Sequence, residues 1–408
     1  MKPLGPIPPG FTTIDGELAI GGQAASRLVE AAGDTPLFVY SGEAIRRKLA
    51  SLRAAMPAPL RIHYAIKANS YRPVLEFMRD CVDGFDIASG GELLMALEAG
   101  QDPRVISFAG PGKRDTELEL AIRHGVALNL ESEGEARRAL AAAERLGLVP
   151  RLAIRVNPEF ELRGSGMKMG GGAKPFGIDQ ERVPALAREL LSAGAEWRGL
   201  HIFTGSQALD AAAIAETQGN VLDLAARLTE EIGAPLPHLN MGGGLGIPYF
   251  HGDRPVDAEA VGAALHERLR HLPPALAGTE LAIELGRYLV GEAGVYLTRI
   301  VDRKESHGQV YLVTDGGLHH QLAASGNFGA VVRRNYPAAI ATRFDSEPEE
   351  EVNVVGCLCT PLDRLADQAF LPRANVGDLV AMFCAGAYGA SASPSAFLGQ
   401  GPAREMLV

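Results

Sequence analysis

The sequence predicts an α/β fold, a TIM-like (β/α)8 barrel followed by an all-β domain, and three observations lead to this prediction. The chain has 408 residues, more than one hydrophobic core usually holds, so two domains are expected. From Arg61 onward, eight strand-like apolar runs alternate with seven helical patterns, which is typical of parallel βα units that close into a barrel. After Arg287 the pattern changes to strand-like segments with few helices between them. An open, doubly wound sheet is the alternative for the first part.

The elements are justified in chain order by their apolar periodicity. Residues 1–35 hold two strand-like pieces, Phe11–Ile14 and Glu17–Ile20, and a helical run, Ala24–Gly33, and we expect them to add to the β-domain. Within a barrel domain over residues 36–287, an extra run at Leu37–Tyr40 precedes the eight strands expected at Arg61–Lys67, Gly84–Ala88, Val105–Ala109, Ala127–Leu130, Arg151–Val156, Gly199–Phe203, His238–Met241 and Glu280–Glu284. The helices are expected at Pro73–Asp80, Glu92–Ala99, Thr116–His124, Glu133–Gly147, Glu181–Ala193, Ala211–Ile232 and Asp257–His271. The β-domain, residues 288–408, has strand patterns at Val295–Lys304, Gln309–Thr314, Glu351–Leu358, Asp378–Phe383 and Arg404–Val408.

Composition restricts the classes of partner and compartment. A net charge of −10 argues against nucleic acid or an anionic membrane surface as a partner. No apolar run approaches the ~20 residues of a membrane-spanning helix, and the proline-rich start lacks the apolar core of a signal peptide. The four cysteines are few and unevenly placed, and the C-x-C at Cys357 and Cys359 has no His-rich partner cluster. We therefore expect a cytoplasmic protein without a metal site.

Lys67 is the first candidate for chemistry. It stands near the end of a strand that reads as buried, where an ammonium group loses hydration. Desolvation favours the neutral amine, which can form a Schiff base with an aldehyde. The alternative for this stretch alone is a lysine that extends from the strand end into solvent.

Polar and glycine residues gather at the carboxyl ends of the predicted strands, where barrel enzymes place their active sites. Asp86, Arg155 and Asn157 end strands two and five, and Phe203–Gln207 ends strand six. Strand seven ends in a glycine triplet, Gly242, Gly243 and Gly244. A triplet without side chains lets backbone N–H groups approach a phosphate, although a tight turn explains it equally well.

Neighbouring strand ends strengthen the phosphate interpretation. Ser206, Gly286 and Arg287 lie at the ends of strands six and eight. An aldehyde-trapping lysine beside a phosphate site suggests pyridoxal 5′-phosphate. Glu284 then acquires a role, because a carboxylate facing the pyridine nitrogen keeps that nitrogen protonated. A strand-end salt bridge is the alternative for Glu284. Arg155 either hydrogen-bonds the Glu284 carboxylate or the cofactor, or pairs with a neighbouring acid.

Seven motifs carry a resemblance to a known family. They are Y-A-I-K-A-N, F-D-I-A-S-G-G-E, H-I-F-T-G-S-Q, N-M-G-G-G-L-G, E-L-G-R, C-T-P-L-D and A-G-A-Y-G, and they extend over nearly the whole chain. The chain resembles the alanine-racemase-like pyridoxal-phosphate decarboxylases of diaminopimelate, ornithine and arginine. Within them it is most similar to the subgroup associated with exosortase systems. The carrier-protein-linked glutamate decarboxylase of aminoglycoside assembly is a further relative.

The resemblance implies roles for the site residues. Lys67 would hold the cofactor covalently, Asp86 would lie near it, and Glu284 would bind the pyridine nitrogen. The phosphate group would be bound by residues that share small or polar side chains at the strand ends and in the β-domain: Ser206, Gly242, Gly243, Gly244, Gly286, Arg287 and Tyr388.

The resemblance also implies a head-to-tail homodimer that shares two active sites. Cys359 and Asp363 would reach in from the partner subunit, Cys359 to return a proton after loss of CO2 and Asp363 to contact the substrate amine. A cysteine near the carbon that loses CO2 is a suitable proton donor. The alternatives are a buried apolar cysteine at 359 and a core or interface tyrosine at 388.

Two departures from the family pattern affect the expected substrate. Phe203 stands where many members have a histidine on the cofactor ring; phenylalanine can stack there but cannot donate a hydrogen bond. Thr360 and Pro361 replace a Glu-Ser pair whose glutamate helps diaminopimelate decarboxylases recognise the distal end of the substrate. A different diamino acid, a glutamate-like acid or a carrier-tethered amino acid therefore becomes the expected substrate. His319–Gln321 receives no role.

Three other functions remain open beside decarboxylation. A racemase of the same fold is the nearest alternative, although racemases of this type usually pair the ring nitrogen with an arginine, whereas Glu284 favours decarboxylation. A non-catalytic cofactor-binding protein of this fold would lack the β-domain and the motifs around Cys359 and Tyr388. An aldolase-type Schiff base at Lys67 would leave the C-terminal motifs unexplained.

Overall fold

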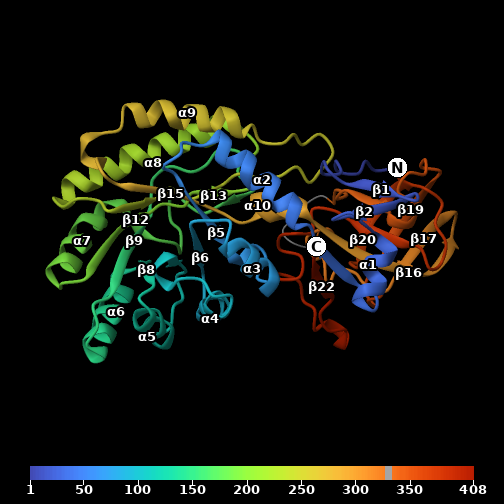
Figure 1. Ribbon diagram of the computed structural model, residues 1–408, viewed down its shortest axis with the longest axis horizontal. Helices are drawn as coiled ribbons and strands as arrows, with labels where there is room; N and C mark the ends of the chain where they lie inside the picture. Colours follow the sequence, from blue (N-terminus) through green and yellow to red (C-terminus); the bar gives the residue numbers. More distant parts are fainter. Residues whose placement is uncertain (327–332) are drawn as a thin grey trace. The chain divides into compact units, whose positions relative to one another are not determined.

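The computed structural model describes residues 1–326 and 333–408, which divide into two compact units (Figure 1). The barrel unit comprises Leu49–Gly246 and Pro255–Leu285. The β-rich unit comprises Met1–Lys48, Ile247–Arg254 and Gly286–Val408. Among the helices of these ranges, none has both the length and the apolar character that crossing a membrane requires.

Eight parallel strands close the barrel. In order around the ring they are β5 (Arg61–Ala65), β6 (Gly84–Ile87), β7 (Ile106–Phe108), β8 (Ala127–Leu130), β9 (Arg151–Asn157), β12 (Glu196–His201), β14 (His238–Asn240) and β15 (Glu280–Leu285). The ring closes because β15 pairs with β5 and β8 pairs with β9. The predicted barrel is confirmed, and the alternative of an open sheet is wrong. Every residue of β9 is buried, as expected for a strand covered on both faces.

One helix or helical segment occupies each gap between barrel strands, and Figure 1 shows these helices on the outside of the strands. They are α3 (Arg72–Arg79), α4 (Gly90–Glu98), α5 (Asp115–His124), α6 (Glu133–Leu146), α7 (Val183–Ser192), α8 (Ala211–Ile232) and α9 (Ala258–Arg270). Ser89, Ser132, Asp210 and Asp257 cap four of them, each accepting a hydrogen bond from a backbone N–H of the first turn. Three short strands complete the unit: β10 (Met167–Lys168), β11 (Ile178–Asp179) and β13 (Gly205–Ser206).

The β-rich unit contains an eight-stranded sheet centred on the long strand β16 (Gly294–Ser306). The other strands are β4 (Leu37–Tyr40), β17 (Gln309–Thr314), β18 (Ala338–Ile340), β19 (Glu350–Val355), β20 (Arg364–Leu371), β21 (Leu379–Met382) and β22 (Arg404–Leu407). The first half of β16 pairs with β4 and β21, and its second half pairs with β17. The main path runs β18-β21-β16-β17-β19-β20, and β4 joins β16 to β22.

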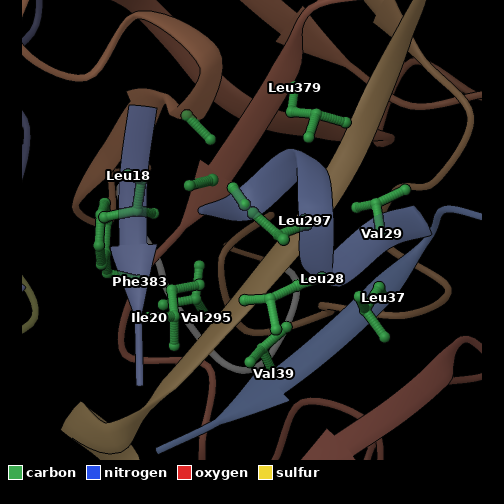
Figure 2. Packing of buried hydrophobic residues seen from close by; sticks show 13 residues of the cluster. Leu18, Ile20, Leu28, Val29, Leu37, Val39, Val295, Leu297, Leu379 and Phe383 are labelled. Carbon is green, nitrogen blue, oxygen red and sulfur yellow. The ribbon is translucent and has the colours of Figure 1, made fainter. Parts of the chain in front are cut away.

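The N-terminal segment packs into the core of the β-rich unit. It forms β1 (Thr12–Ile14), β2 (Glu17–Ile20), β3 (Gln23–Ala24) and α1 (Ala25–Ala32). Figure 2 shows side chains of this segment, Leu18, Ile20, Leu28 and Val29, packed with side chains of β4, β16 and β21 and with Phe383.

Four features differ from the sequence predictions. The run Leu37–Tyr40, assigned to the barrel domain, pairs with β16 and β22 and so lies in the β-rich unit. The strand β20 was not predicted, and neither was the helix α2 (Gly42–Ala55). A second helix absent from the prediction, α10 (Arg287–Val290), follows the last barrel strand.

Candidate active site

Lys67 follows the first barrel strand but is not buried. β5 ends at Ala65, and the chain enters the 3-10 turn η1 (Ile66–Ala68), where Ile66 and Ala68 are buried and Lys67 is exposed. The expectation of a lysine buried at a strand end is therefore wrong, because the turn directs residue 67 away from its packed neighbours. The Lys67 ammonium lies 5.7 Å from the centroid of the Phe203 ring.

The Phe203 ring has two cationic neighbours. Besides Lys67, the Arg155 guanidinium carbon lies 5.9 Å from the ring centroid. Phe203 is buried, and it comes two residues after the end of β12. The place that the family often gives to a histidine therefore holds an aromatic ring that favours flat or cationic neighbours.

Glu131 positions Arg155 and was missed by the sequence analysis. The Glu131 Oε1 atom lies 3.1 Å from Nη1 of Arg155, and both side chains are buried. Glu131 also accepts hydrogen bonds from the N–H of Gly110 at 2.5 Å and from the N–H of Gly177 at 2.9 Å. The sequence offered one indication of this role, because Glu131 comes directly after β8. The other site residues were identified by the same position at a strand end.

Glu284 is a buried carboxylate that remains ionised. Its Oε2 atom lies 2.8 Å from Nε2 of His201 and accepts a hydrogen bond from the Asn240 amide at 3.1 Å. Burial alone would raise the pKa of Glu284, but His201, with Lys67 and Arg155, lowers it to about 2. A permanently negative group here can hold a protonated ring nitrogen. His201 and Asn240 lie within the H-I-F-T-G-S-Q and N-M-G-G-G-L-G motifs but received no role in the sequence analysis.

Asp86 lies near the end of β6 and is paired with a histidine. Its Oδ2 atom lies 3.4 Å from Nδ1 of His63, and both side chains are buried. Burial favours the neutral imidazole, yet the nearby Asp86 carboxylate raises the pKa of His63 above its ordinary value. The Asp86 carboxylate therefore favours the protonated form of His63 in the barrel interior.

The glycine triplet has both a packing role and unused donors. A Cβ on Gly243 would lie 1.9 Å from the Glu284 carbonyl oxygen, and one on Gly242 would lie 2.7 Å from the Ile202 carbonyl oxygen. The N–H of Gly242 bonds Oδ1 of Asn240 at 2.9 Å. Within residues 1–326 and 333–408, the N–H groups of Gly243 and Gly244 make no hydrogen bond. The close packing fits a tight turn, and the two remaining N–H groups are donors that an anion would need.

Ser206 lies in β13, opposite Met167 of β10, and is half-buried. A lysine amine, an ionised buried carboxylate and free backbone N–H groups thus occur together at one end of the barrel unit. These are the groups that an aldehyde, a pyridine nitrogen and a phosphate would each require. The residues of this unit fit pyridoxal 5′-phosphate.

In the β-rich unit, Gly286 precedes α10 and Arg287 opens it. The Arg287 guanidinium lies 4.7 Å from the Tyr388 ring centroid and donates a hydrogen bond to the Tyr249 hydroxyl at 2.8 Å. Its Nε atom is buried and has no partner among the described residues. The structure therefore brings Arg287 and Tyr388 together as expected and adds Tyr249, which the sequence analysis missed.

Cys359 and Asp363 lie in the loop between β19 and β20 in contrasting environments. Cys359 is exposed, whereas Asp363 is buried. The Asp363 oxygens accept hydrogen bonds from the N–H groups of Leu318, at 2.6 Å, and Leu358, at 2.8 Å. The Asp363 carboxylate therefore joins two loops, and its predicted contact with the substrate amine stays a prediction.

His319 and Gln321 are buried, and their four side-chain nitrogen and oxygen atoms have no hydrogen-bond partner in the described part of the chain. His320 instead lies 3.0 Å from the Tyr296 hydroxyl and 2.9 Å from the Gly401 carbonyl oxygen. The motif that received no role in the sequence analysis is therefore an internal feature of the β-rich unit.

Comparison with known proteins identifies the family. The sequence profile described as "Pyridoxal-dependent decarboxylase, pyridoxal binding domain" matches residues 42–291. The chain is 34% identical over 380 residues to the L-glutamyl-[BtrI acyl-carrier protein] decarboxylase of Niallia circulans, which covers 92% of this chain and 89% of that protein. It is 32% identical over 382 residues to the diaminopimelate decarboxylase of Archaeoglobus fulgidus, with coverage of 93% and 89%.

A solved structure of a diaminopimelate decarboxylase from M. jannaschii, in co-complex with L-lysine, matches with a TM-score of 0.87 and 26% identity, over 98% of this chain and 93% of that chain. The matches agree with the ionised carboxylate at Glu284, which favours decarboxylation over racemisation. The reaction class is decarboxylation of an amino acid, and the cofactor is pyridoxal 5′-phosphate. The chain belongs to the pyridoxal-dependent decarboxylase family.

Proposed function

We propose that the substrate is an amino acid tethered to a carrier protein, rather than a free diamino acid. The observation that carries this proposal is the loop after Cys359. Its one carboxylate, Asp363, is buried and already accepts two backbone hydrogen bonds. The residues between them, Thr360, Pro361 and Leu362, carry no charge. The distal ammonium group of a free diamino acid would therefore find no ionic partner in this loop.

The comparisons also support a carrier-tethered substrate. The relative from Niallia circulans acts, by its name, on a glutamyl group attached to an acyl-carrier protein. Diaminopimelate decarboxylases match at similar identity, so identity alone does not separate the two substrate classes. The uncharged loop is what favours the tethered substrate.

The cofactor supplies an electron sink for the bond that loses CO2 when it is bound. Lys67 would hold the cofactor aldehyde, and Glu284 would keep the pyridine nitrogen protonated. Gly243, Gly244 and Ser206 of the barrel unit would bind the phosphate. Arg155 would be held by Glu131, and Asp86 would be held by His63.

We also propose a homodimer with shared active sites, as the family resemblance implies. In such a dimer, Cys359 of one subunit returns a proton to the carbon that loses CO2 in the site of the other. The exposed position of Cys359 leaves its thiol accessible for this role. We further propose the cytoplasm as the compartment, because all four cysteines are free thiols.

The substrate is tested by measuring CO2 release from the cofactor-loaded protein. The panel holds free glutamate, lysine, ornithine, arginine and meso-diaminopimelate, and glutamyl and aspartyl carrier-protein thioesters. We expect turnover of a thioester and at least about tenfold less with every free acid. Preferred turnover of a free diamino acid would contradict the tethered substrate and leave the reaction class intact. No CO2 from any substrate, with exchange of the Cα hydrogen for deuterium, would instead indicate racemisation.

Lys67→Ala provides the test of the cofactor assignment. Removing the amine should abolish the visible absorbance of covalently held cofactor, whereas Lys168→Ala, on an exposed lysine of β10, should leave it unchanged. Cofactor absorbance that survives in Lys67→Ala would contradict the role given to Lys67.

A further inference from the structure

The barrel unit contains a cavity at the end opposite the predicted active site. It has a volume of about 260 Å³ and is lined by residues that begin or precede barrel strands, among them Arg61 of β5, Ala127 of β8 and His238 of β14. Barrel interiors are normally filled by bulky branched side chains. Here Ser107, Ala127 and Ala153 face the cavity, and their small side chains leave the space open.

Positive charge exceeds negative charge around this cavity. Its lining includes three arginines, Arg61, Arg104 and Arg198, and two carboxylates, Asp83 and Glu280. Both carboxylates have partners, since Arg61 lies 3.5 Å from Asp83 and 3.3 Å from Glu280. Arg104 and Arg198 are therefore the source of excess positive charge, because Arg198 shares the carboxylate of Glu196 with Arg151.

Arg198 and Arg104 have donors that nothing in the described chain uses. The Nε atom of Arg198 is buried without a hydrogen-bond acceptor. Glu196 lies 3.5 Å from Arg198 but 2.9 Å from Arg151, so this one carboxylate is shared between two cations. Arg104 is exposed, and its guanidinium forms no ion pair within residues 1–326 and 333–408. A buried unpaired donor is costly, which favours an acceptor from outside the chain.

Two histidines form the inner wall. The rings of His63 and His238 are stacked with centroids 5.9 Å apart. Burial, followed by the charges of His63 and Arg198, lowers the pKa of His238 to about 3. His238 is thus a neutral imidazole that can donate a hydrogen bond.

We propose that this cavity binds a small oxyanion, a phosphate or a carboxylate, between Arg198 and Arg104 at its mouth and His238 on its inner wall. Guanidinium groups match the geometry of both oxyanions. The site is separate from the predicted cofactor phosphate site, because its lining lies at the amino-terminal ends of the strands. It does not depend on the proposed substrate.

The test is calorimetric titration of the cofactor-loaded protein with inorganic phosphate, in chloride buffer, and in a second arm with acetate. The loaded protein is used so that the cofactor's own phosphate site is filled. We expect Arg198→Gln to raise the phosphate Kd at least about tenfold, because a charge-assisted hydrogen bond is lost. Ala127→Leu, which fills the cavity without changing charge, should abolish binding.

Arg227→Gln, which removes an exposed arginine of α8, is the matched control and should leave the Kd unchanged. If acetate competes with phosphate for binding, the cavity is a general oxyanion site. If phosphate binds and acetate does not, the ligand is a phosphate. Phosphate binding that is equal in the wild-type, Arg198→Gln and Ala127→Leu proteins overturns the proposal. The absence of binding by both anions in the millimolar range also overturns it. Ala127→Leu keeps the test valid if Arg198→Gln does not fold.

Discussion

The side chain of Glu284 combines burial with a permanent negative charge. Removing a carboxylate from water favours its neutral form, so the ionised state requires nearby positive charge. The electrostatic effect of His201, with those of Lys67 and Arg155, lowers the pKa of Glu284, and Asn240 adds a hydrogen bond at 3.1 Å. This arrangement matches the proposed role of binding a protonated pyridine nitrogen.

Glu284→Gln tests that role by replacing one carboxylate oxygen with an amide nitrogen. Glutamine is close in size but has no charge, so a bound pyridine nitrogen would lose its proton and the cofactor would withdraw electrons less strongly. We expect kcat to fall about 100-fold or more, by analogy with the loss of one preorganised electrostatic group. The cofactor should still bind, as measured by its absorbance. Wild-type kcat in this variant would contradict the role.

His320 gives the β-rich unit a predictable response to acid. The Gly401 carbonyl can only accept, so Nε2 carries the hydrogen and Nδ1 accepts from the Tyr296 hydroxyl. Burial, followed by the neighbouring His319, lowers the pKa of His320 from 6.5 to about 4, and the carboxylates facing it, Asp315 and Asp363, offset only part of this shift. The unfolded chain therefore binds a proton that the folded protein rejects.

Stability should consequently fall as the pH drops from 6.5 towards 4, by at most about 1.4 kcal/mol per pH unit for this one proton. We predict that His320→Asn reduces the slope of unfolding free energy against pH in that window, as measured by urea titrations. His271→Asn, at an exposed histidine, should retain the wild-type slope. An unchanged slope in His320→Asn would show that His320 does not remain neutral in the folded protein.

Residue-scale predictions from sequence succeeded where a position follows from strand periodicity. Arg155, Phe203 and Glu284 lie at the strand ends where the pattern placed them. The exposure of Lys67 and the inward direction of Asp363 depend on a 3-10 turn and on two loops that meet only in the folded chain. The apolar periodicity of the sequence predicts neither the exposure of Lys67 nor the direction of the Asp363 side chain.

At the scale of elements, one side chain connects several strand ends. Glu131 follows β8, contacts Arg155 of β9, and accepts hydrogen bonds from the N–H of Gly110 after β7 and of Gly177 before β11. A single carboxylate therefore connects the loop after β7, the strand β9 and the turn before β11.

Glu131→Gln should release these loops. The amide keeps one acceptor oxygen but places an N–H₂ group against a backbone donor and leaves Arg155 buried without its ion pair. We expect a loss of about 3 kcal/mol in unfolding free energy, as for other broken buried pairs, together with weaker cofactor binding.

Glu133→Gln is the matched control, since Glu133 pairs with the exposed Arg182 and lies only two residues away. Its effect should stay within about 0.5 kcal/mol. Equal losses in the two variants, measured by chemical unfolding, would show that the Glu131 clamp has no special role.

Long, regular elements were predictable, and irregular ones were not. The barrel strands and helices lie within a few residues of their predicted ranges because each presents a continuous apolar pattern. Helix α4 begins at Gly90 rather than Glu92, because Ser89 accepts the hydrogen bond of the Glu92 N–H and so caps the first turn. Strand β20 was missed because Leu365, Ala366 and Asp367 are buried in succession, which removes the alternation that identifies a strand.

At the scale of the whole molecule, the predicted chemistry is divided between the units. Lys67 and Glu284 belong to the barrel unit, while Arg287, Tyr388 and Cys359 belong to the β-rich unit. If Cys359 acts in the site of the partner subunit, two different inactive subunits can together form one intact site.

Mixing Lys67→Ala with Cys359→Ala protein, after dissociation and reassociation, should restore about a quarter of wild-type activity, because half of the dimers are mixed and each holds one intact site. The matched control mixes Lys67→Ala with Glu284→Gln. Both residues lie in the barrel unit, so no intact site can form and activity should not return. Failure of the first mixture to recover activity would place Cys359 in the site of its own subunit.

The central strand β4 has a consequence for how the chain is made. Residues 37–40 lie between β16 and β22, so their neighbours on both sides come from residues 294–297 and 404–407. A ribosome therefore releases one strand of this sheet long before it releases either of that strand's partners. The barrel unit, which ends at residue 285, can fold while synthesis continues, whereas β4 lacks its full set of hydrogen bonds until residues 404–407 have been made.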